Sequence, residues 1–463
     1  MAINFDNASP WKDIVPCNVA ANGTVTNVGS PTRDGSAGRT MVRIPKYWIK
    51  AEEKKVIAGI EWKQTLDTWA RLTDANISGD GIHSYNWVIS PVSKPGFEVH
   101  PAFNQRAVSP PADYIYVAAY EATLMDDAGV LKLDSKTGEQ PWTGYSSDVK
   151  DGMLSIPYNS GSVEFTVGET LTGATSAHTG VVVAYHLTSG TWGGGDAAGT
   201  VYAKQASGAF QAEDLNGSTG GANMASATGA GTGVPLTVGN ARTYATNIGT
   251  GWGLMNIWTL SAIQMLYMVE YGSMDSQTNV GRGIVDKASG TGFAGEVTGF
   301  DSIDTNLAAN GTGTGTGVDG VTPVAYRWME NLWGNTWGFI DGYNAVDAEY
   351  RMINRDGSGT FADTLAAGDY EASVATPIAT DGYISDIIFE ELLKYQLFAS
   401  AVAGGATTYI PDYWYAHDAG ETNIALAGGS WGSGANTGLA YLSSRYDVAF
   451  STLSVAGRAE FIA

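Results

Sequence analysis

The chain has 463 residues, of which 44% are hydrophobic, 11% aromatic and 16% charged. This composition can fill a core, and it excludes a chain that is disordered throughout. The 25 basic and 47 acidic residues give a net charge of −22, which would repel phosphate backbones, so general nucleic-acid binding is not expected.

The same inventory limits redox chemistry and membrane association. The single cysteine, Cys17, excludes an intrachain disulfide and a thiolate zinc site. No basic segment followed by an apolar run begins the sequence, so no signal peptide is expected. No stretch of about 20 apolar residues occurs, so no membrane insertion is expected. We expect synthesis in a cytoplasm and release only by lysis or assembly.

The first part of the chain predicts an extended segment followed by short strands. Residues 1–40 are rich in Gly, Asn and Thr and are expected to be extended, as a candidate attachment or oligomer contact. The string MVRIPKYWIK (41–50) predicts a strand, with Pro45 at an edge or bulge. Residues 61–72 predict a short amphipathic helix because tryptophan and leucine recur at helical intervals. Strand-like runs follow at 85–90, 96–103 and 113–122.

Residues 161–235 change in character and predict a small all-β module. Short apolar runs are separated by Gly, Ser and Asp turns without a helical period. The low-complexity end of this segment, 216–234, is expected to be a loop or linker. Because both flanking regions are rich in aromatics, we interpret 41–160 and 236–463 as two parts of one domain that the module interrupts.

The second flank contains the clearest helix signal of the sequence. The run TLSAIQMLYMVEYGS predicts a helix capped by Thr259 or Ser261 and ended by Gly272. Residues 306–320 are expected to form a mobile loop. In ENLWGNTWGFIDGYN (330–344), large rings alternate with glycine, a pattern typical of core packing and turns.

Several strings, taken in this order, resemble phage tail-fibre and receptor-binding proteins that carry a C-type-lectin-like domain. This family is related in fold to the major tropism determinant and other variable proteins, and distantly to the formylglycine-generating enzyme. The matching strings cover about two thirds of the chain. They are MVRIPKYWIK, GFEVHPAF, DYIYVAAYEA, GWGLMNIW, IQMLYMVEYGSMDSQTNVGRG, ENLWGNTWGFIDGYN and GGSWGSGANTGLAYL…GRAEF.

The resemblance implies an α+β fold: a C-type-lectin-like domain with a twisted mixed sheet, two helices and long loops, interrupted by the β module. It also implies that the C-terminal segment forms a solvent-facing ligand surface. Tail fibres are commonly trimeric, so the resemblance further implies a homotrimer that contacts other virion tail proteins.

The C-terminal segment from Ala427 begins with the composition of a flexible linker but also contains bulky aromatics. Rigid aromatics mixed with small polar residues are typical of binding loops. We therefore predict an ordered ligand-binding segment, whose alternative is a Gly-rich turn followed by a final strand pair. The candidate ligand-binding residues are Trp431, Ser433, Asn436, Thr437, Tyr441, Ser443, Ser444, Tyr446 and Asp447, with Tyr413 and Trp414 nearby.

Neither a metal site, nor a cofactor, nor a catalytic residue is predicted. The five histidines show no metal-binding spacing, and NRDGSGTF (354–361) lacks the ligand spacing and closing Glu of a calcium loop. Formylglycine generation requires reactive cysteines, and the lone Cys17 lies outside the matching strings. Neither a nucleophile elbow nor a phosphate-binding loop occurs.

The sequence thus favours a non-enzymatic virion protein, at a tail fibre or tail tip, that recognises a host surface glycan or protein. Two alternatives remain open. The chain could be a decoration protein that cements neighbouring subunits, or a tail-associated hydrolase of surface polysaccharide.

Overall fold

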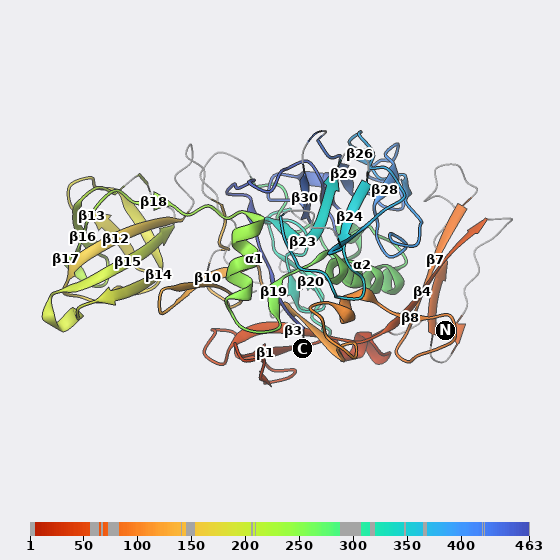
Figure 1. Ribbon diagram of the computed structural model, residues 1–463, viewed down its shortest axis with the longest axis horizontal. Coiled ribbons are helices and arrows are strands. Elements are labelled where there is room, and N and C mark those ends of the chain that lie inside the picture. Colours follow the sequence, from red (N-terminus) through yellow and green to blue (C-terminus); the bar gives the residue numbers. More distant parts are fainter. Residues whose placement is uncertain are drawn as a thin grey trace.

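The protein is represented by a computed structural model with three parts along its length (Figure 1). A central body carries the β module at one end and the paired strands β4 (Trp48–Lys55) and β7 (His83–Ser90) at the other. The structure describes residues 5–55, 64–65, 68–72, 83–139, 141–144, 153–204, 207–208, 210–287, 307–314, 320–346, 349–363, 368–418, 420 and 422–462.

Strands form most of the regular structure, and this corrects the predicted α+β, C-type-lectin-like fold. The chain is 36% strand and 12% helix, with most strands in antiparallel sheets. Isolated helices shorter than about 12 residues are marginal in water, and glycine-rich turns cut most apolar runs to less than that length. The described α-helices are α1 (Val238–Thr246), α2 (Ile257–Tyr271) and α3 (Ser276–Asn279).

One six-stranded antiparallel sheet joins segments from both sides of the module. Its order is β19-β33-β9-β3-β1-β2, so the C-terminal β33 lies between β9 and β19. The strand predicted at 41–50 is divided, because β3 ends at Pro45 and β4 (Trp48–Lys55), which belongs to another sheet, begins three residues later. The strands are β1 (Val15–Val19), β2 (Val25–Thr26), β3 (Arg39–Pro45), β9 (Tyr114–Ala118), β19 (Trp252–Leu254) and β33 (Ala459–Ile462).

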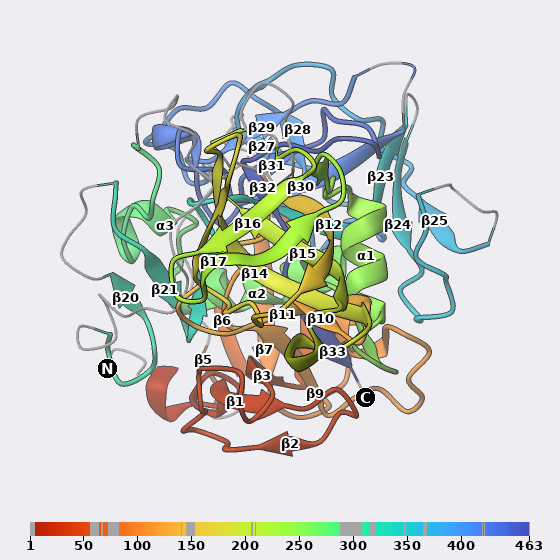
Figure 2. The ribbon, with the colours of Figure 1, turned by 90° about the vertical axis from the view of Figure 1, so that its left-hand side faces the viewer.

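A second, eight-stranded sheet forms the opposite side of the body (Figures 1 and 2). Its order is β25-β24-β23-β30-β31-β29-β26, and β32 pairs in parallel with β23. The strands are β23 (Trp337–Val346), β24 (Glu349–Ile353), β25 (Tyr370–Ala372), β26 (Gly382–Tyr383), β29 (Tyr413–Tyr415), β30 (Asn423–Ala427), β31 (Leu442–Ser443) and β32 (Val455–Ala456).

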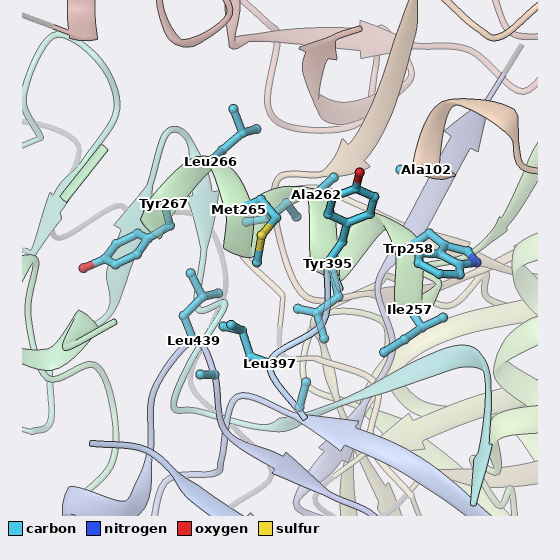
Figure 3. Packing of buried hydrophobic residues seen from close by; sticks show 14 of the residues in the cluster. Ala102, Ile257, Trp258, Ala262, Met265, Leu266, Tyr267, Tyr395, Leu397 and Leu439 are labelled. Carbon is cyan, nitrogen blue, oxygen red and sulfur yellow. The ribbon is translucent and has the colours of Figure 1, made fainter. Parts of the chain in front are cut away.

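Helix α2 lies in the main core of the body, where it packs against β- and loop residues (Figure 3). Gly272 ends it in the left-handed conformation with φ 63°, as predicted, but the N-cap is Asn256 and not Thr259 or Ser261. Every residue from Ile257 to Val269 is buried, so the helix has no exposed face. A helix that is apolar all round belongs inside a core.

Glu460 of β33 fixes the beginning of α2. Its buried carboxylate accepts hydrogen bonds from Asn256 Nδ2 (2.7 Å) and Thr259 Oγ1 (2.7 Å), and it pairs with Arg106 at 2.6 Å. A carboxylate is favourable at the N-terminus of a helix, where backbone N–H groups point outward. The central helix therefore depends on a residue from the end of the chain.

The helix predicted over 61–72 is wrong where the structure describes it. Those residues form β5 (Gln64–Thr65) and β6 (Thr68–Leu72), and β6 pairs with β7 (His83–Ser90). Strand pairing outweighs the helical spacing, because a neighbouring strand satisfies the backbone that a short isolated helix would leave exposed. β4 (Trp48–Lys55) and β8 (Glu98–Val99) complete this sheet.

Smaller elements connect the sheets. Two hairpins are β10 (Thr123–Asp127) with β11 (Val130–Asp134), and β27 (Asp386–Ile387) with β28 (Ala399–Ala401). A three-stranded sheet contains β20 (Gly313–Thr314), β21 (Val324–Tyr326) and β22 (Met329–Glu330). The mobile loop predicted over 306–320 lies partly outside the described residues.

The module is a small β-barrel with its own apolar core. Its strands run in the order β15-β14-β13-β16-β17-β12, and β12 also pairs with β15, which closes the ring. The linker predicted over 216–234 is wrong, because these small residues form barrel strands. The strands are β12 (Leu154–Gly161), β13 (Thr170–Gly173), β14 (Thr179–Ser189), β15 (Ala197–Lys204), β16 (Glu213–Gly217), β17 (Gly221–Ala227) and β18 (Thr232–Gly233).

Two halves of this barrel repeat the same short motif. The pattern Glu-x-Leu-x-Gly occurs at 169–173 and again at 213–217, and these segments pair antiparallel through β13 and β16. Glu213 accepts backbone N–H bonds from Thr175 and Ser176, both 2.7 Å, in the loop that follows the first motif. Glu169 accepts the equivalent bonds from the loop that follows the second, from Thr219 (3.2 Å) and Gly220 (3.3 Å).

Candidate recognition surface

Two short strands, β26 and β29, bring three tyrosines to the outer side of the eight-stranded sheet. Tyr383 of β26 lies opposite Tyr413 of β29 in an antiparallel pair. Successive side chains of a strand point to opposite sides. Trp414 is accordingly buried in the core, whereas Tyr413 and Tyr415 are half-buried on the outside. The sequence Tyr-Trp-Tyr therefore divides its rings between core and surface.

The three rings form a contiguous aromatic row. The ring centroids of Tyr383 and Tyr413 are 5.1 Å apart at 78°, and those of Tyr413 and Tyr415 are 4.7 Å apart at 46°. These separations are normal for interacting aromatic pairs. The hydroxyl of Tyr383 donates to Asn436 Oδ1 at 2.7 Å, so Asn436 fixes one end of the row.

An ion pair fixes the other end. The guanidinium of Arg445 lies 5.1 Å from the centroid of the Tyr415 ring and pairs with Asp381, which also accepts the backbone N–H of Ala416 at 2.9 Å. Both charged side chains remain partly exposed, at 36% for Arg445 and 29% for Asp381. We call Tyr383, Tyr413, Tyr415, Asn436 and Arg445 the tyrosine surface.

Within the tyrosine surface, Tyr413 offers a neutral hydroxyl group and Arg445 a fixed cation at physiological pH. Burial, together with Tyr415 and Asp381, raises the pKa of Tyr413 above its ordinary value. Partial burial opposes the charge of Arg445, but Asp381 outweighs it and raises the pKa of this guanidinium. Tyr413 is therefore a hydrogen-bond donor and Arg445 a permanent charge.

Of the eleven candidate ligand-binding residues, the structure places Tyr413 and Asn436 in the tyrosine surface. Trp431 and Tyr441, which were expected to face outward, are instead 9% and 1% exposed. Trp431 packs against Ile284 and Leu453 because the chain folds back over it. Large apolar rings gain more free energy in such a cluster than in water.

Four further candidates are also buried and hold the fold together. The hydroxyl of Ser444 lies 2.5 Å from Tyr343 Oη, and its N–H donates to the carbonyl of Tyr415. Ser443 pairs with Leu426 of β30. The structure assigns these residues packing positions: Trp414, Thr437, Ser443 and Ser444.

The remaining three candidates lie at the surface outside the tyrosine row. Tyr446 stacks on Phe450, with centroids 3.8 Å apart at 16°, and is half-buried. Asp447 is exposed and accepts the N–H of Ala449 at 3.0 Å, which closes a local turn. Ser433 is half-buried and accepts the N–H of Ser430 at 3.0 Å.

The sequence did not identify Tyr383, Asp381 or Arg445 as members of this surface. Tyr383 and Asp381 occur in a polar segment, 381–385, without a distinctive motif. Only the antiparallel pairing of β26 with β29 brings them to the row. The period of two in Tyr413-Trp414-Tyr415 was the one usable signal, because it separates an outer face from a core face.

Other chemistry is limited in the part of the chain that the structure describes. There, no group of three or more His, Cys, Asp or Glu side chains is placed to hold a metal ion. An internal cavity of about 20 Å³ beside the buried Glu121 and Arg458 has room for a single water molecule. Among the described helices, none is both long and apolar enough to cross a membrane.

The tyrosine surface has the rigid aromatics and adjacent polar groups that binding proteins use. Comparison with known proteins assigns it no ligand: no protein-family model matches the sequence, and no curated protein matches it either.

Proposed function

We propose that the chain is a phage virion protein of a tail fibre or tail tip, and that it binds a host surface glycan or protein through the tyrosine surface. The observation that supports this most is the row of three half-buried tyrosines, with Asn436 at one end and Arg445 at the other. The order of the sequence strings that resemble tail-fibre proteins supports the virion assignment.

The composition of the tyrosine surface suits recognition. Tyrosine supplies a large contact area and loses little conformational entropy, because it has only two side-chain torsions. The paired strands β26 and β29 hold these rings before a ligand arrives, which reduces the cost of ordering them on binding. Tyrosine hydroxyls, an amide and a guanidinium provide both donors and acceptors for a polar ligand.

The position of the surface also favours attachment. β26 and β29 lie on one side of the body, and the six-stranded sheet with β1 and β3 lies on the other (Figures 1 and 2). One side is therefore available for a receptor while the other contacts virion tail proteins. A homotrimer would present three copies, and linked copies raise the overall affinity without new contacts.

The test is the double substitution of Tyr383→Ala with Tyr413→Ala in the assembled particle. We expect adsorption to host cells to fall at least about tenfold, because two of the three rings are lost from the contact. Particle yield and morphology are expected to be unchanged. Trp431 and Tyr441 are unsuitable targets, since their burial means that replacing them would disturb the fold.

Val374→Ser provides the matched control, because Val374 is 92% exposed and lies outside the tyrosine surface. This change should leave adsorption intact. If the double substitution instead prevents assembly, a decoration role is favoured over receptor binding. Cleavage of host polysaccharide by the purified chain would favour the hydrolase, and unchanged adsorption would exclude the tyrosine surface as the receptor site.

A further inference from the structure

A second aromatic cluster lies in the β-barrel module, around Trp192 at the turn between β14 and β15. The Trp192 ring is stacked on Tyr158, with centroids 5.5 Å apart at 17°. Phe165 and Tyr185 meet it edge-on, at 5.4 Å and 6.2 Å. Tyr158 and Phe165 are buried, whereas Trp192 and Tyr185 remain half-buried. The three neighbouring rings thus hold the indole in place, and part of it remains open to solvent.

The loop that carries Trp192 consists mainly of glycine. Gly190 and Gly195 have φ of 75° and 70°, a left-handed backbone that favours glycine. Gly193 differs from these two glycines, because its φ is not in the left-handed region. An added Cβ at this position would meet no atom within 4 Å. Neither backbone strain nor packing explains glycine at 193. The Cβ position of Gly193 therefore faces open space in the loop that carries Trp192.

A carboxylate accompanies the ring. Tyr185 Oη donates a hydrogen bond to Glu164 Oε1 at 2.6 Å, and Glu164 is exposed. Burial, reinforced by Glu164, raises the pKa of Tyr185 to about 12, so this hydroxyl stays protonated. An exposed ionised carboxylate can accept two hydrogen bonds from neighbouring hydroxyl groups of a ligand.

We propose that Trp192, Tyr185 and Glu164 form a binding site for neutral hexopyranoses, which we call the tryptophan platform. A pyranose has an apolar C–H face that can pack on an indole, and hydroxyl groups at its rim that can donate to Glu164. Glu164 and the net charge of −22 disfavour acidic sugars. This site is separate from the tyrosine surface and does not require a virion.

The test is titration of the intact chain with neutral oligosaccharides, with binding measured by calorimetry and saturation-transfer NMR. The oligosaccharides are cellohexaose, maltohexaose, mannohexaose and a β-galactan fragment. We expect at least one of them to bind, and Trp192→Ala to weaken that binding at least about tenfold. Glu164→Gln keeps the aromatic cluster and should weaken oligosaccharide binding about threefold to tenfold.

Two substitutions at Gly193 show whether weaker binding comes from a blocked surface or from a damaged fold. Gly193→Arg should weaken binding at least about tenfold, because residue 193 directly follows Trp192 and a long side chain at this open position can cover the indole. Gly193→Ala should bind like the wild type. Tyr413→Ala should leave this binding unchanged, which distinguishes the tryptophan platform from the tyrosine surface.

Three results would overturn the proposal. They are the absence of binding of every neutral oligosaccharide to the wild type, equal affinity of the wild type and the Trp192→Ala variant, and binding that is lost with Tyr413→Ala but kept with Trp192→Ala. The last result would leave the proposed function of the tyrosine surface in place.

Discussion

The module and the body are both built mainly from strands, but they are held together in different ways. All strand pairings of the barrel occur between residues 154 and 233, and the barrel has its own apolar cluster. The body instead pairs the C-terminal β33 with β9 and β19, and Glu460 with the start of α2. The module therefore depends on neighbours in the sequence, and the body on contacts between distant segments.

The largest effect on stability is expected from Glu460→Gln, which removes a long-range contact of the body. Glu460 is fully buried, and its removal leaves Arg106 without its carboxylate partner. Breaking a buried ion pair by removing one member costs about 3–5 kcal/mol. We expect hydrogen exchange to show lost protection throughout the body, and unchanged protection in the barrel.

Asp113→Asn is the control for this change. Asp113 pairs with Lys46 at 2.6 Å, but its side chain is 80% exposed. Exposed ion pairs contribute at most about 1 kcal/mol. If Glu460→Gln lowers protection in the barrel as much as in the body, the two regions unfold as one unit and the contrast between them fails.

A smaller effect on stability is expected from Glu213→Ala, which removes a local contact of the barrel. The substitution leaves the N–H groups of Thr175 and Ser176 without their acceptor. Thr175 is exposed and Ser176 is half-buried, so water can replace the lost acceptor, and we expect a cost of about 0.5–1.5 kcal/mol. Exchange should accelerate in the barrel alone, whereas Gln211→Ala, at an exposed neighbouring position, should change nothing. Equal acceleration in the body would contradict local stabilisation.

The smallest effect is a difference in pH dependence between the two regions. Burial raises the pKa of Glu213, but hydrogen bonds from Ser176 and the backbone outweigh it, so the net pKa is lowered. Its stabilisation is present above the unfolded-state pKa, about 4.3, and is lost as the pH falls through the folded-state pKa. Glu213→Gln should therefore flatten the acid-induced loss of barrel stability.

In the body, Asp412 makes stability depend on pH in the opposite direction. Its complete burial raises the pKa of this carboxyl well above the ordinary value, although Ala440 donates to it at 2.7 Å. Its stabilisation is present below the unfolded-state pKa and is lost as the pH rises through the folded-state pKa. Asp412→Asn should remove this loss of stability as the pH rises above the unfolded-state pKa. Unfolding curves between pH 3 and 8 that keep the same slope in both variants would contradict the assignment.

The sequence predicted the elements whose signals are local. The first half of the strand predicted at 41–50, which lies in β3, and the end of the central helix at Gly272 were recognisable from a short window. The helix over 61–72 and the linker over 216–234 were wrong, because strand pairing with other segments decides both. Small residues fit barrel strands where backbones approach closely, so their composition alone resembles a linker.

The candidate site was predictable only in part. The composition of the C-terminal segment indicated binding, and Asn436 does lie in the tyrosine surface. Composition does not tell which way a ring points, so Trp431 and Tyr441 were wrongly expected outside. Tyr383 reaches the row only through pairing between strands that are separated in the chain, which a local pattern does not contain.

The two glutamate motifs of the barrel bear on how it folds. Each carboxylate accepts one backbone N–H from its own segment, Thr166 to Glu169 and Gln211 to Glu213, and further N–H groups from the loop that follows the other motif. Neither half can therefore complete its hydrogen bonds alone. A half-formed barrel would lack the hydrogen bonds that link the two motifs. We therefore expect the β13–β16 pair to form in the rate-limiting step, and the barrel to fold and unfold in a single kinetic phase.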